Sequence, residues 1–539
     1  MRKNIQRWAL AAGAALVVLM GSMSVGCAGG DAPDGRGDAS QGQEVPAAQE
    51  GPKTLKAGST TYFYAESMDP ASDWDSWYLS YYGIVENLCR VSDDLSPEPW
   101  LAKSVEQVDD VTWEIELNEG ITFSNGVPLD AAAVKACWER TYAENSRAAE
   151  TLAYDELIAE GNVLTIKTTE KLPSLPNTLC DPLLCVYYVG DDVADYADAT
   201  PATGPYVKKE FVAEDHIVMV PNESYWGGKP KLDEVELICF ADDNAITMAM
   251  QNGEIQAVAM PSASTAAVLA GEDRFTIERR TSSRADFIRM NMEHPLIQEA
   301  AVREAVAYCI DRDGYASVIC QGSADPSWGV YSPTLPFGGT QGLDVTVTSC
   351  DPSAAARVLE EAGIVDSDGD GVRELNGTPV ELDLYTCTNY ERFTMIADDL
   401  QSKLADAGIK LNIVPTDYFL EDAETFASDD PDMTLDSYAM APTGNQAYFA
   451  NISFATDGSN NFGKYSNAEV DSLIRELDGT FDEAQRNELA RQIAQQVLAD
   501  LPYVFFANSE AVVVAGPGVT GLAAAPSEYY FVTAETDVA

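Results

Sequence analysis

Histidine serves both metal binding and acid–base catalysis more often than any other residue type, and this chain of 539 residues contains only two. His216 and His294 lie far apart, and neither has another soft metal ligand beside it in the sequence. This spacing does not favour a zinc cluster or a Ser-His-Asp triad, and no HExxH motif is present. We expect both histidines to be structural, with a single ligating histidine as the open alternative.

An acidic stretch at 366–371 (DSDGDG) is the second candidate for metal chemistry. It places carboxylates at its first, third and fifth positions and glycine at its sixth, as calcium-binding loops do. The twelfth position is Gly377, where such loops carry a bidentate glutamate, although Glu374 stands at the ninth. We therefore predict a solvated turn, with a calcium site as the alternative.

The balance of charge restricts the possible partners. Lys and Arg number 33 against 87 Asp and Glu, which gives a formal charge of -54. Such a chain repels the phosphates of nucleic acids and of anionic membrane surfaces, so we expect no nucleic-acid partner. Hydrophobic residues make up 46% of the sequence, enough to fill the cores of two or more lobes at this length.

The N-terminal segment predicts export. A basic stretch at 2–7 precedes an almost wholly apolar one at 8–20, which is typical of a signal peptide and too short for a membrane span. The following Ser-Val-Gly-Cys27 resembles a bacterial lipobox, in which the cysteine is acylated; a plain secretory signal is the alternative. We predict a signal peptide at 1–26, lipidation of Cys27, a flexible linker at 27–52 and an extracytoplasmic location at the cell membrane.

The cysteines that follow Cys27 are expected to stay mostly as buried thiols. They are odd in number, lack the CxxC spacing of a zinc site, and several stand in apolar surroundings. The sequence leaves a bond between Cys180 and Cys185 open.

Hydrophobic periodicity indicates a mixture of strands and helices. Alternating apolar residues predict strands at 111–117 and 163–169, and a helix is predicted to begin after Asp130, whose carboxylate can cap it. Asp243 is predicted to cap a helix at 245–251. Two further helices are predicted at about 466–478 and 482–499, followed by a strand at 503–506. This mixed order indicates α/β or α+β lobes.

Four blocks of sequence, read in order, carry a family resemblance. They are 83–88 with 99–104, 123–126 and 128–131; 203–206 with 220–230 and 253–255; 302–305 with 307–308 and 310–312; and 465–467 with 470–473. Together they resemble the peptide/nickel family of bacterial solute-binding proteins (solute-binding protein family 5) that serve ABC importers. The resemblance implies an α/β fold with two lobes, similar to type II periplasmic binding proteins with an extra inserted subdomain, and a ligand cleft between the lobes.

The same resemblance implies how the chain is divided. Lobe I is expected at 53–283, including the inserted subdomain, lobe II at 284–504, and residues 505–539 are expected to return to lobe I. A hinge of two crossing strands would let the lobes close over a ligand.

In function, the resemblance implies a monomeric substrate-binding lipoprotein that is not an enzyme and has no cofactor. It would capture a small peptide or a carboxylate-rich nickel or other metal chelate and deliver it to an ABC permease and its ATPase. Two alternatives stay open. One is a secreted hydrolase that uses a pair of carboxylates, and the other is a sensor or adhesion lipoprotein that reuses the binding fold.

The resemblance also suggests which residues contact the ligand. Peptide-binding relatives hold the peptide amine with an acid, but the matching region, 437–444, contains none. The 441–442 pair and the 123–126 block look more like the nickel-binding branch, where an arginine holds a carboxylate of the chelate. Arg147 stands at the matching place, with a surface ion pair as its alternative role.

Aromatic residues supply the other candidates. Trp74, Trp77 and Tyr78 belong to the segment after the first strand, which faces the cleft in the family, and Tyr438 is a further candidate. Core packing is the alternative for these aromatics. By contrast, Tyr225 and Trp226 stand in a glycine- and proline-rich stretch between two expected strands, and we predict that they anchor a structural corner.

Overall fold

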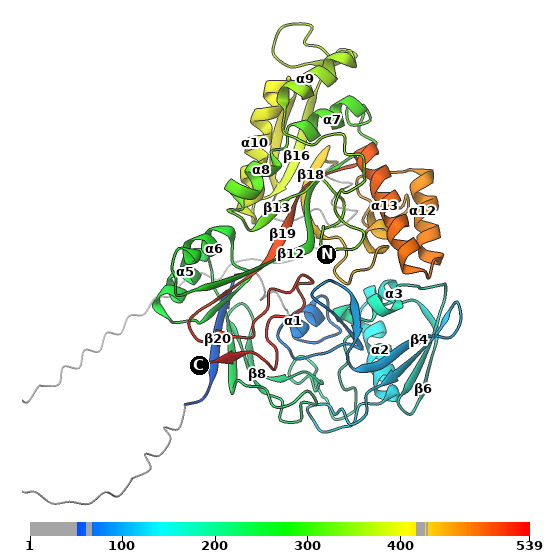
Figure 1. The fold of residues 1–539 in the computed structure, drawn as a ribbon, viewed down its shortest axis with the longest axis vertical. Coiled ribbons are helices and arrows are strands. Elements are labelled where there is room, and N and C mark those ends of the chain that lie inside the picture. The colour runs from blue at the N-terminus through cyan, green and yellow to red at the C-terminus, as the bar shows by residue number, and fades with distance from the viewer. Residues whose placement is uncertain (1–50, 61–66, 417–425, 427–429) are drawn as a thin grey trace, which may run out of the picture. The chain divides into compact units, whose positions relative to one another are not determined.

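Two long antiparallel strands, β12 (Thr276–Met290) and β19 (Tyr503–Ala515), run side by side through the middle of the protein (Figure 1). The computed structural model describes residues 51–60, 67–416, 426 and 430–539. Both strands belong to an eleven-stranded sheet with the order β17-β16-β18-β12-β19-β11-β1-β10-β9-β8, in which β13 also pairs with β19. Its other members are β1 (Thr54–Ser59), β8 (Tyr206–Val212), β9 (His216–Pro221), β10 (Glu234–Cys239), β11 (Ala257–Ala259), β13 (Ala324–Pro326), β16 (Glu381–Cys387), β17 (Lys410–Thr416) and β18 (Met433–Ala439).

The pairing of β12 with β19 is interrupted near its centre. The register shifts between Thr281 and Ala285, and again between Asp286 and Phe287. Beyond the first shift β12 also pairs with β18, so the bulge separates two differently paired halves of the strand. Bulges bend and twist a ladder locally, which makes this a suitable place for a hinge. The predicted boundary at 283/284 falls at this bulge, and the residue limits of the lobes stay a prediction.

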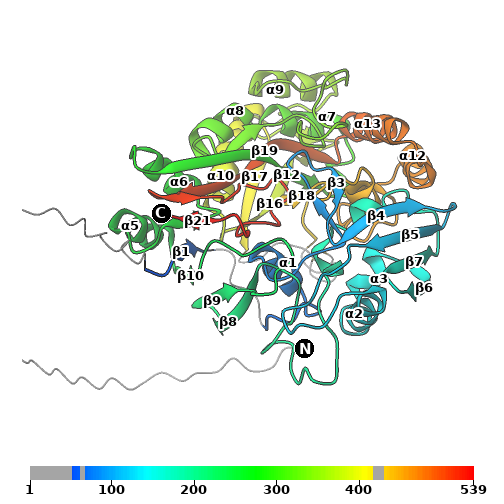
Figure 2. The same cartoon turned by 60° about the horizontal axis from the view of Figure 1, so that its bottom comes forward.

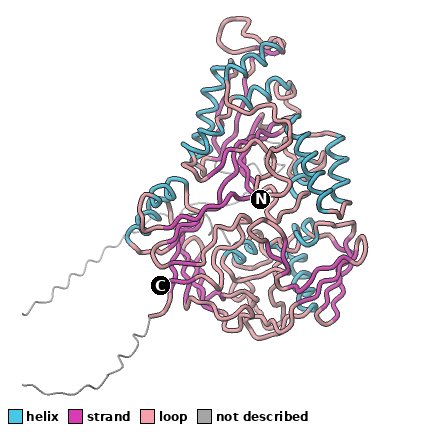
Figure 3. The backbone as a smooth tube through the Cα atoms, viewed as in Figure 1, coloured by secondary structure: helices cyan, strands magenta, loops and turns pink. Residues whose placement is uncertain are grey.

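Helices pack around the strands at one end of the large sheet (Figures 1 and 3). They include α7 (Ala300–Tyr308), α9 (Pro352–Glu361) and α10 (Glu391–Ala407). In α10, Phe393, Ile396 and Leu400 recur at three- and four-residue spacing and are buried, as an amphipathic helix requires. They share a core with Leu384 of β16 and Val504 of β19.

The other end of the protein carries a second sheet, ordered β4-β5-β7-β6 and lying apart from the large sheet in Figure 2. Its strands are β4 (Ala102–Gln107), β5 (Thr112–Leu117), β6 (Tyr154–Glu160) and β7 (Val163–Thr168). β5 and β7 confirm the predicted strands. The adjoining helix α2 (Ala131–Glu144) begins as predicted, because the Asp130 carboxylate accepts the Ala133 backbone N–H at 2.8 Å.

One helix cap differs from the prediction. Helix α5 (Asp243–Asn252) begins at Asp243, and its cap is Asp242, whose carboxylate accepts the Ala245 backbone N–H at 2.9 Å. Two adjacent aspartates offer the same chemistry, and only the backbone geometry selects between them, because the cap must stay extended while the next residue is helical. Together with α6 (Ala263–Ala270), α5 forms a small separate core.

The remaining elements include both helices predicted near the C-terminus. These are α12 (Ala468–Gly479) and α13 (Glu483–Asp500). The strand expected at 503–506 is the start of the much longer β19. Short elements complete the fold: α1 (Asp75–Tyr81), α3 (Arg147–Thr151), α4 (Leu175–Thr178), α8 (Arg312–Gly314), η1 (Pro182–Leu184), η2 (Tyr315–Ile319), η3 (Ala450–Phe454), and the pairs β2 (Cys89–Val91) with β3 (Pro97–Pro99), β14 (Glu374–Leu375) with β15 (Thr378–Pro379), and β20 (Val519–Thr520) with β21 (Asp537–Val538).

No disulfide joins Cys180 to Cys185, and seven of the nine cysteines of the described residues are buried. Among the described residues, no helix combines the length and hydropathy that crossing a bilayer requires. The predicted signal peptide, the Cys27 lipidation site and nearly all of the predicted linker lie outside the described residues.

Candidate ligand-binding site

Arg147 opens the short helix α3 and lies over an aromatic ring. Its guanidinium carbon is 3.7 Å from the centre of the Trp74 ring, and its Nη2 donates to the backbone carbonyl of Asp73. Asn145 fixes the same carbonyl through its side-chain amide at 3.1 Å. Within the described part of the chain, Arg147 forms no ion pair. Its charge is therefore held in position while the rest of the guanidinium stays available to a carboxylate.

The predicted aromatics of helix α1 divide into an exposed ring and two packed ones. Trp74 is 49% exposed and lies edge-on to Trp77, with ring centres 6.3 Å apart. Trp77 donates its indole N–H to the Glu528 carbonyl at 2.9 Å and meets the Tyr529 ring at 6.3 Å. Tyr78 stacks against Trp77 at 6.4 Å. Trp77 is thus partly fixed by the C-terminal segment, Tyr78 packs on Trp77, and Trp74 presents its face to Arg147.

Tyr438 lies in β18 and belongs to a second aromatic group. Its ring stacks on that of Tyr448 at 6.4 Å, with the two phenol oxygens 3.4 Å apart, and packs on Phe449 at 5.4 Å. Burial raises the pKa of Tyr448 well above its ordinary value; Tyr438 and Asp181 add to the rise, and the positive charge of Arg147 opposes it.

Electrostatic influence connects these two groups, because Arg147 acts on the pKa values of buried groups in both. Burial raises the pKa of the Asp181 carboxyl, and Arg147 acts against that rise. Burial also raises the pKa of Tyr529, with Asp181 and Tyr448 contributing. These effects link Arg147, Asp181, Tyr448 and Tyr529, which come from four distant parts of the chain. We predicted only Arg147 of these four, and no local pattern distinguishes the other three.

Direct contacts join the turn at 441–444 to helix α4 and to the chain near Leu95. The side-chain amide of Asn177 in α4 donates to the Thr443 carbonyl at 2.7 Å. Gly444 has φ +72°, and a β-carbon there would lie 1.9 Å from the Leu95 carbonyl oxygen. The turn at 441–444 therefore approaches the chain near Leu95 as closely as a residue without a side chain permits.

The corner at Tyr225 and Trp226 is satisfied internally, as predicted for scaffold. The Tyr225 hydroxyl donates to one oxygen of Glu86 at 3.0 Å, and the Trp226 indole N–H donates to the other at 2.8 Å. Glu86 is fully buried. Burial raises its pKa to about 7, against the lowering effect of these hydrogen bonds.

Among the described residues, neither the two histidines nor the acidic loop contacts Arg147. His216 contacts Asp215 at 2.7 Å, and His294 contacts Asp432 at 3.3 Å. In the acidic loop, oxygens of Asp366, Asp368, Asp370 and Glu374 lie within 4.8 Å of one another. The Asp366 carboxylate already accepts the backbone N–H groups of two loop glycines, 369 and 371, which is the hydrogen bonding of a turn.

Comparison with known proteins gives a consistent result. The family model of bacterial extracellular solute-binding proteins, family 5 (middle), matches residues 96–460. The nickel-binding protein NikA of Staphylococcus aureus is 27% identical over 458 residues, which cover 85% of this chain and 89% of that one. The glutathione-binding protein GsiB of Salmonella paratyphi A is 25% identical over 466 residues, or 83% and 86% of the two chains.

Solved structures agree. The nickel ABC transporter protein from Bacillus halodurans superimposes with a TM-score of 0.76 at 27% identity, and NikA from Staphylococcus aureus in complex with Ni(L-His)2 with 0.75 at 25%. Each comparison covers 90% of this chain and all of the other. The fold is therefore the two-lobed α/β fold of these binding proteins.

Proposed function

The chain belongs to the bacterial extracellular solute-binding proteins of family 5, and on that premise we propose that it captures a carboxylate-bearing metal chelate between its lobes and passes it to an ABC permease. The lobes proposed are 53–283 with 505–539, and 284–504. The observation that supports this ligand class is Arg147, a positioned guanidinium without an ion-pair partner among the described residues, backed by Trp74. A guanidinium grips a carboxylate through two parallel hydrogen bonds, and an aromatic face beneath it fixes its orientation.

The aromatic rings around Arg147 suit the rest of such a ligand. Trp74 is half exposed, and Tyr438 with Tyr448 offers phenol groups. Among the proteins to which the chain is similar, one was solved with Ni(L-His)2 bound, a chelate that carries both carboxylates and flat rings. Nickel or another metal would arrive here as cargo within the chelate.

A small peptide is the second candidate, and Asp181 favours it. Arg147 acts on the charge of its carboxyl, so the pair would offer one group for a carboxylate and, at the Asp181 oxygen that does not cap η1, one for an amine. This compensates in part for the lack of an acid at 437–444. The similarity to a glutathione-binding protein supports the same candidate.

The proposed ligand is tested by native purification followed by mass spectrometry of released small molecules and elemental analysis for nickel, iron, cobalt and zinc. A metal at near-stoichiometric amount together with a carboxylate ligand supports the chelate. A peptide without metal supports the second candidate. Chemical conversion of either ligand during incubation would contradict a purely binding role and favour a hydrolase.

We also propose that the protein is a monomer held at the membrane by lipid on Cys27. Acylation would keep the receptor beside its permease. Labelling of cells with a radioactive fatty acid should mark the wild-type protein and leave Cys27→Ser unmarked and released to the medium. Equal labelling of both proteins would remove Cys27 as the anchor.

A further inference from the structure

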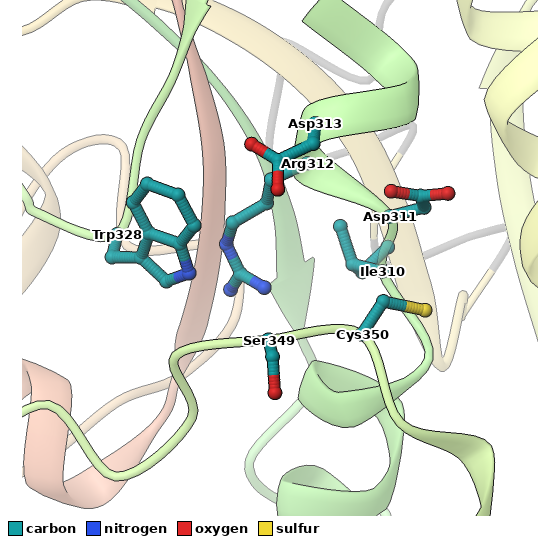
Figure 4. Close-up of a pocket in the computed structure, with 7 residues that line it drawn as sticks. All are labelled: Ile310, Asp311, Arg312, Asp313, Trp328, Ser349 and Cys350. Atoms are coloured by element: carbon teal, nitrogen blue, oxygen red, sulfur yellow. The ribbon is translucent and has the colours of Figure 1, made fainter.

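A cavity of about 320 Å³, shown in Figure 4, is lined by none of the residues proposed for the cleft. It is formed where helix α8 begins, beside the chain after β13 and the chain before α9. Its lining residues are Ile310, Asp311, Arg312, Asp313, Trp328, Ser349 and Cys350. Its volume lies at the lower end of the range of small-molecule sites, and it exceeds the space that a single water needs.

Arg312 is the charged group of this cavity, and it is only 6% exposed. Its Nε donates to the carbonyls of Ser327 at 3.0 Å and Phe505 at 3.1 Å, and its Nη1 to the carbonyl of Ala307 at 3.3 Å. These partners are neutral. No carboxylate of the described residues lies within ion-pair distance of the guanidinium, and its Nη2 has no hydrogen-bond partner there. A buried cation in this state is costly, and burial lowers the pKa of Arg312 to about 10.

A second donor in the same cavity is also unused. The indole Nε1 of Trp328 is buried and has no hydrogen-bond partner among the described residues. The guanidinium carbon of Arg312 lies 5.8 Å from the centre of the Trp328 ring, and in Figure 4 the indole nitrogen lies on the side of the ring that faces the guanidinium. An orphaned buried donor beside an uncompensated cation calls for an acceptor that carries negative charge.

The acidic residues at the rim of the cavity are not the negatively charged acceptor for Arg312 and Trp328. Asp311 accepts the Gly314 backbone N–H at 2.9 Å and lies 3.7 Å from the Lys403 ammonium. Asp313 is exposed, and although its charge favours the charged form of Arg312, it lies beyond ion-pair distance. Figure 4 shows the guanidinium directed away from both carboxylates and toward Ser349.

We propose that this cavity binds a small oxyanion through Arg312 and Trp328, independently of the cleft ligand. The guanidinium Nη2 and the indole N–H supply two donors without partners among the described residues, and Ser349 lines the cavity beside them with its hydroxyl directed away from the guanidinium in Figure 4. Carboxylates and inorganic oxyanions share the chemistry that these donors recognise. The volume leaves room for a carboxylate with a short carbon frame as well as for an inorganic anion.

Binding is tested on the complete mature protein by isothermal titration calorimetry and thermal melting. The probes are inorganic phosphate, sulfate, acetate and succinate, each compared with chloride at equal ionic strength. We expect saturable binding of at least one probe. Saturation by phosphate or sulfate identifies an inorganic anion site, and saturation by acetate or succinate identifies an organic acid site.

The test uses two conservative variants, because replacing Arg312 would also leave three backbone carbonyls without their hydrogen bonds and could prevent folding. Trp328→Phe keeps the ring and removes the N–H, and it should weaken binding about tenfold, the effect of losing one hydrogen bond to a charged group. Ser349→Ala should weaken binding less, because Ser349 is exposed.

Arg274→Ala is the matched control, since it removes a half-exposed guanidinium that belongs neither to this cavity nor to the cleft and should leave anion binding unchanged. Phosphate and sulfate stabilise many proteins without a site, by exclusion from the surface. The proposal is therefore overturned if no probe binds saturably, or if each stabilises Trp328→Phe as much as wild type.

Discussion

The corner and the cleft each place aromatic side chains against one charged group, and they differ in whether the protein itself satisfies the charge. At the corner, Tyr225 and Trp226 both donate to the buried carboxylate of Glu86. At the cleft, Trp74 supports Arg147, which contacts one backbone carbonyl and no acid of the described residues. A buried carboxyl that accepts hydrogen bonds from its neighbours belongs to the scaffold, whereas a positioned charge without a counter-ion is ready for a ligand.

The largest effect is expected from removing the charge at the corner. Glu86→Ala leaves the Tyr225 hydroxyl and the Trp226 indole N–H without their buried acceptor, and should lower the free energy of unfolding by about 3 kcal/mol. Urea unfolding followed by tryptophan fluorescence measures this. Ligand affinity of the folded fraction should stay unchanged. A loss below about 1 kcal/mol would show that the corner does not depend on this carboxylate.

The next largest effect is expected from Gly444→Ala, which tests the close approach of the turn at 441–444 to Leu95. In Gly444→Ala the new β-carbon meets the Leu95 carbonyl oxygen, so the two segments must separate and the open form is favoured. Affinity for the cleft ligand should fall at least tenfold, measured by calorimetry, and small-angle scattering should show a larger radius of gyration.

Gly363→Ala is the control for Gly444→Ala. Gly363 has φ +79°, similar to Gly444, but a β-carbon there would meet no atom within 4 Å. It carries the same backbone strain without the contact, so it should retain the wild-type affinity. Equal losses in both variants would attribute the effect to strain alone.

A smaller effect is the pH dependence of the stability contributed by Glu86. The pKa of Glu86 is raised to about 7 in the folded protein, so between about pH 4.5 and 7 the folded state binds a proton that the unfolded state has lost. This group's contribution to stability is complete below that window and declines as pH rises through it. Glu86→Gln should abolish this component, so the difference between wild type and variant in unfolding free energy should change with pH across the window. A difference independent of pH would contradict the raised pKa.

The smallest effect is expected at Trp74. Trp74→Leu keeps an apolar side chain and removes the aromatic face beneath Arg147, so affinity for a carboxylate ligand should fall about threefold, the scale of one exposed cation–π contact. Stability should change little because the ring is half exposed. An unchanged affinity would show that Arg147 does not need its support.

Much of the fold could be predicted from local chemistry. The alternating strands β5 and β7 and the Asp130 cap follow from periodicity and side-chain hydrogen bonding, and the corner at Tyr225 follows from the glycines and prolines around it. The length of β19 could not be predicted. Asn508, Ser509 and Glu510 interrupt its apolar run, but they lie where β12, β13 and β19 meet, so their backbone groups stay in the sheet.

The candidate site was predictable only in part, for a physical reason. Arg147 and the aromatics of α1 came from matching an ordered set of family motifs. Asp181, Tyr448 and Tyr529 join Arg147 only because the fold brings distant segments together, and nothing in their own neighbourhoods marks them. Which charge lacks a partner is a property of the folded protein as a whole.

The most direct test of the central claim is the affinity of Arg147→Ala for the nickel–L-histidine chelate and for glutathione, measured by calorimetry beside wild type. Arg357→Ala is the control, because Arg357 is an exposed arginine near a carboxylate, Asp351. If Arg147 holds a ligand carboxylate, whichever probe binds wild type should bind Arg147→Ala at least tenfold more weakly and Arg357→Ala equally well. Equal affinity of Arg147→Ala and wild type would contradict the account.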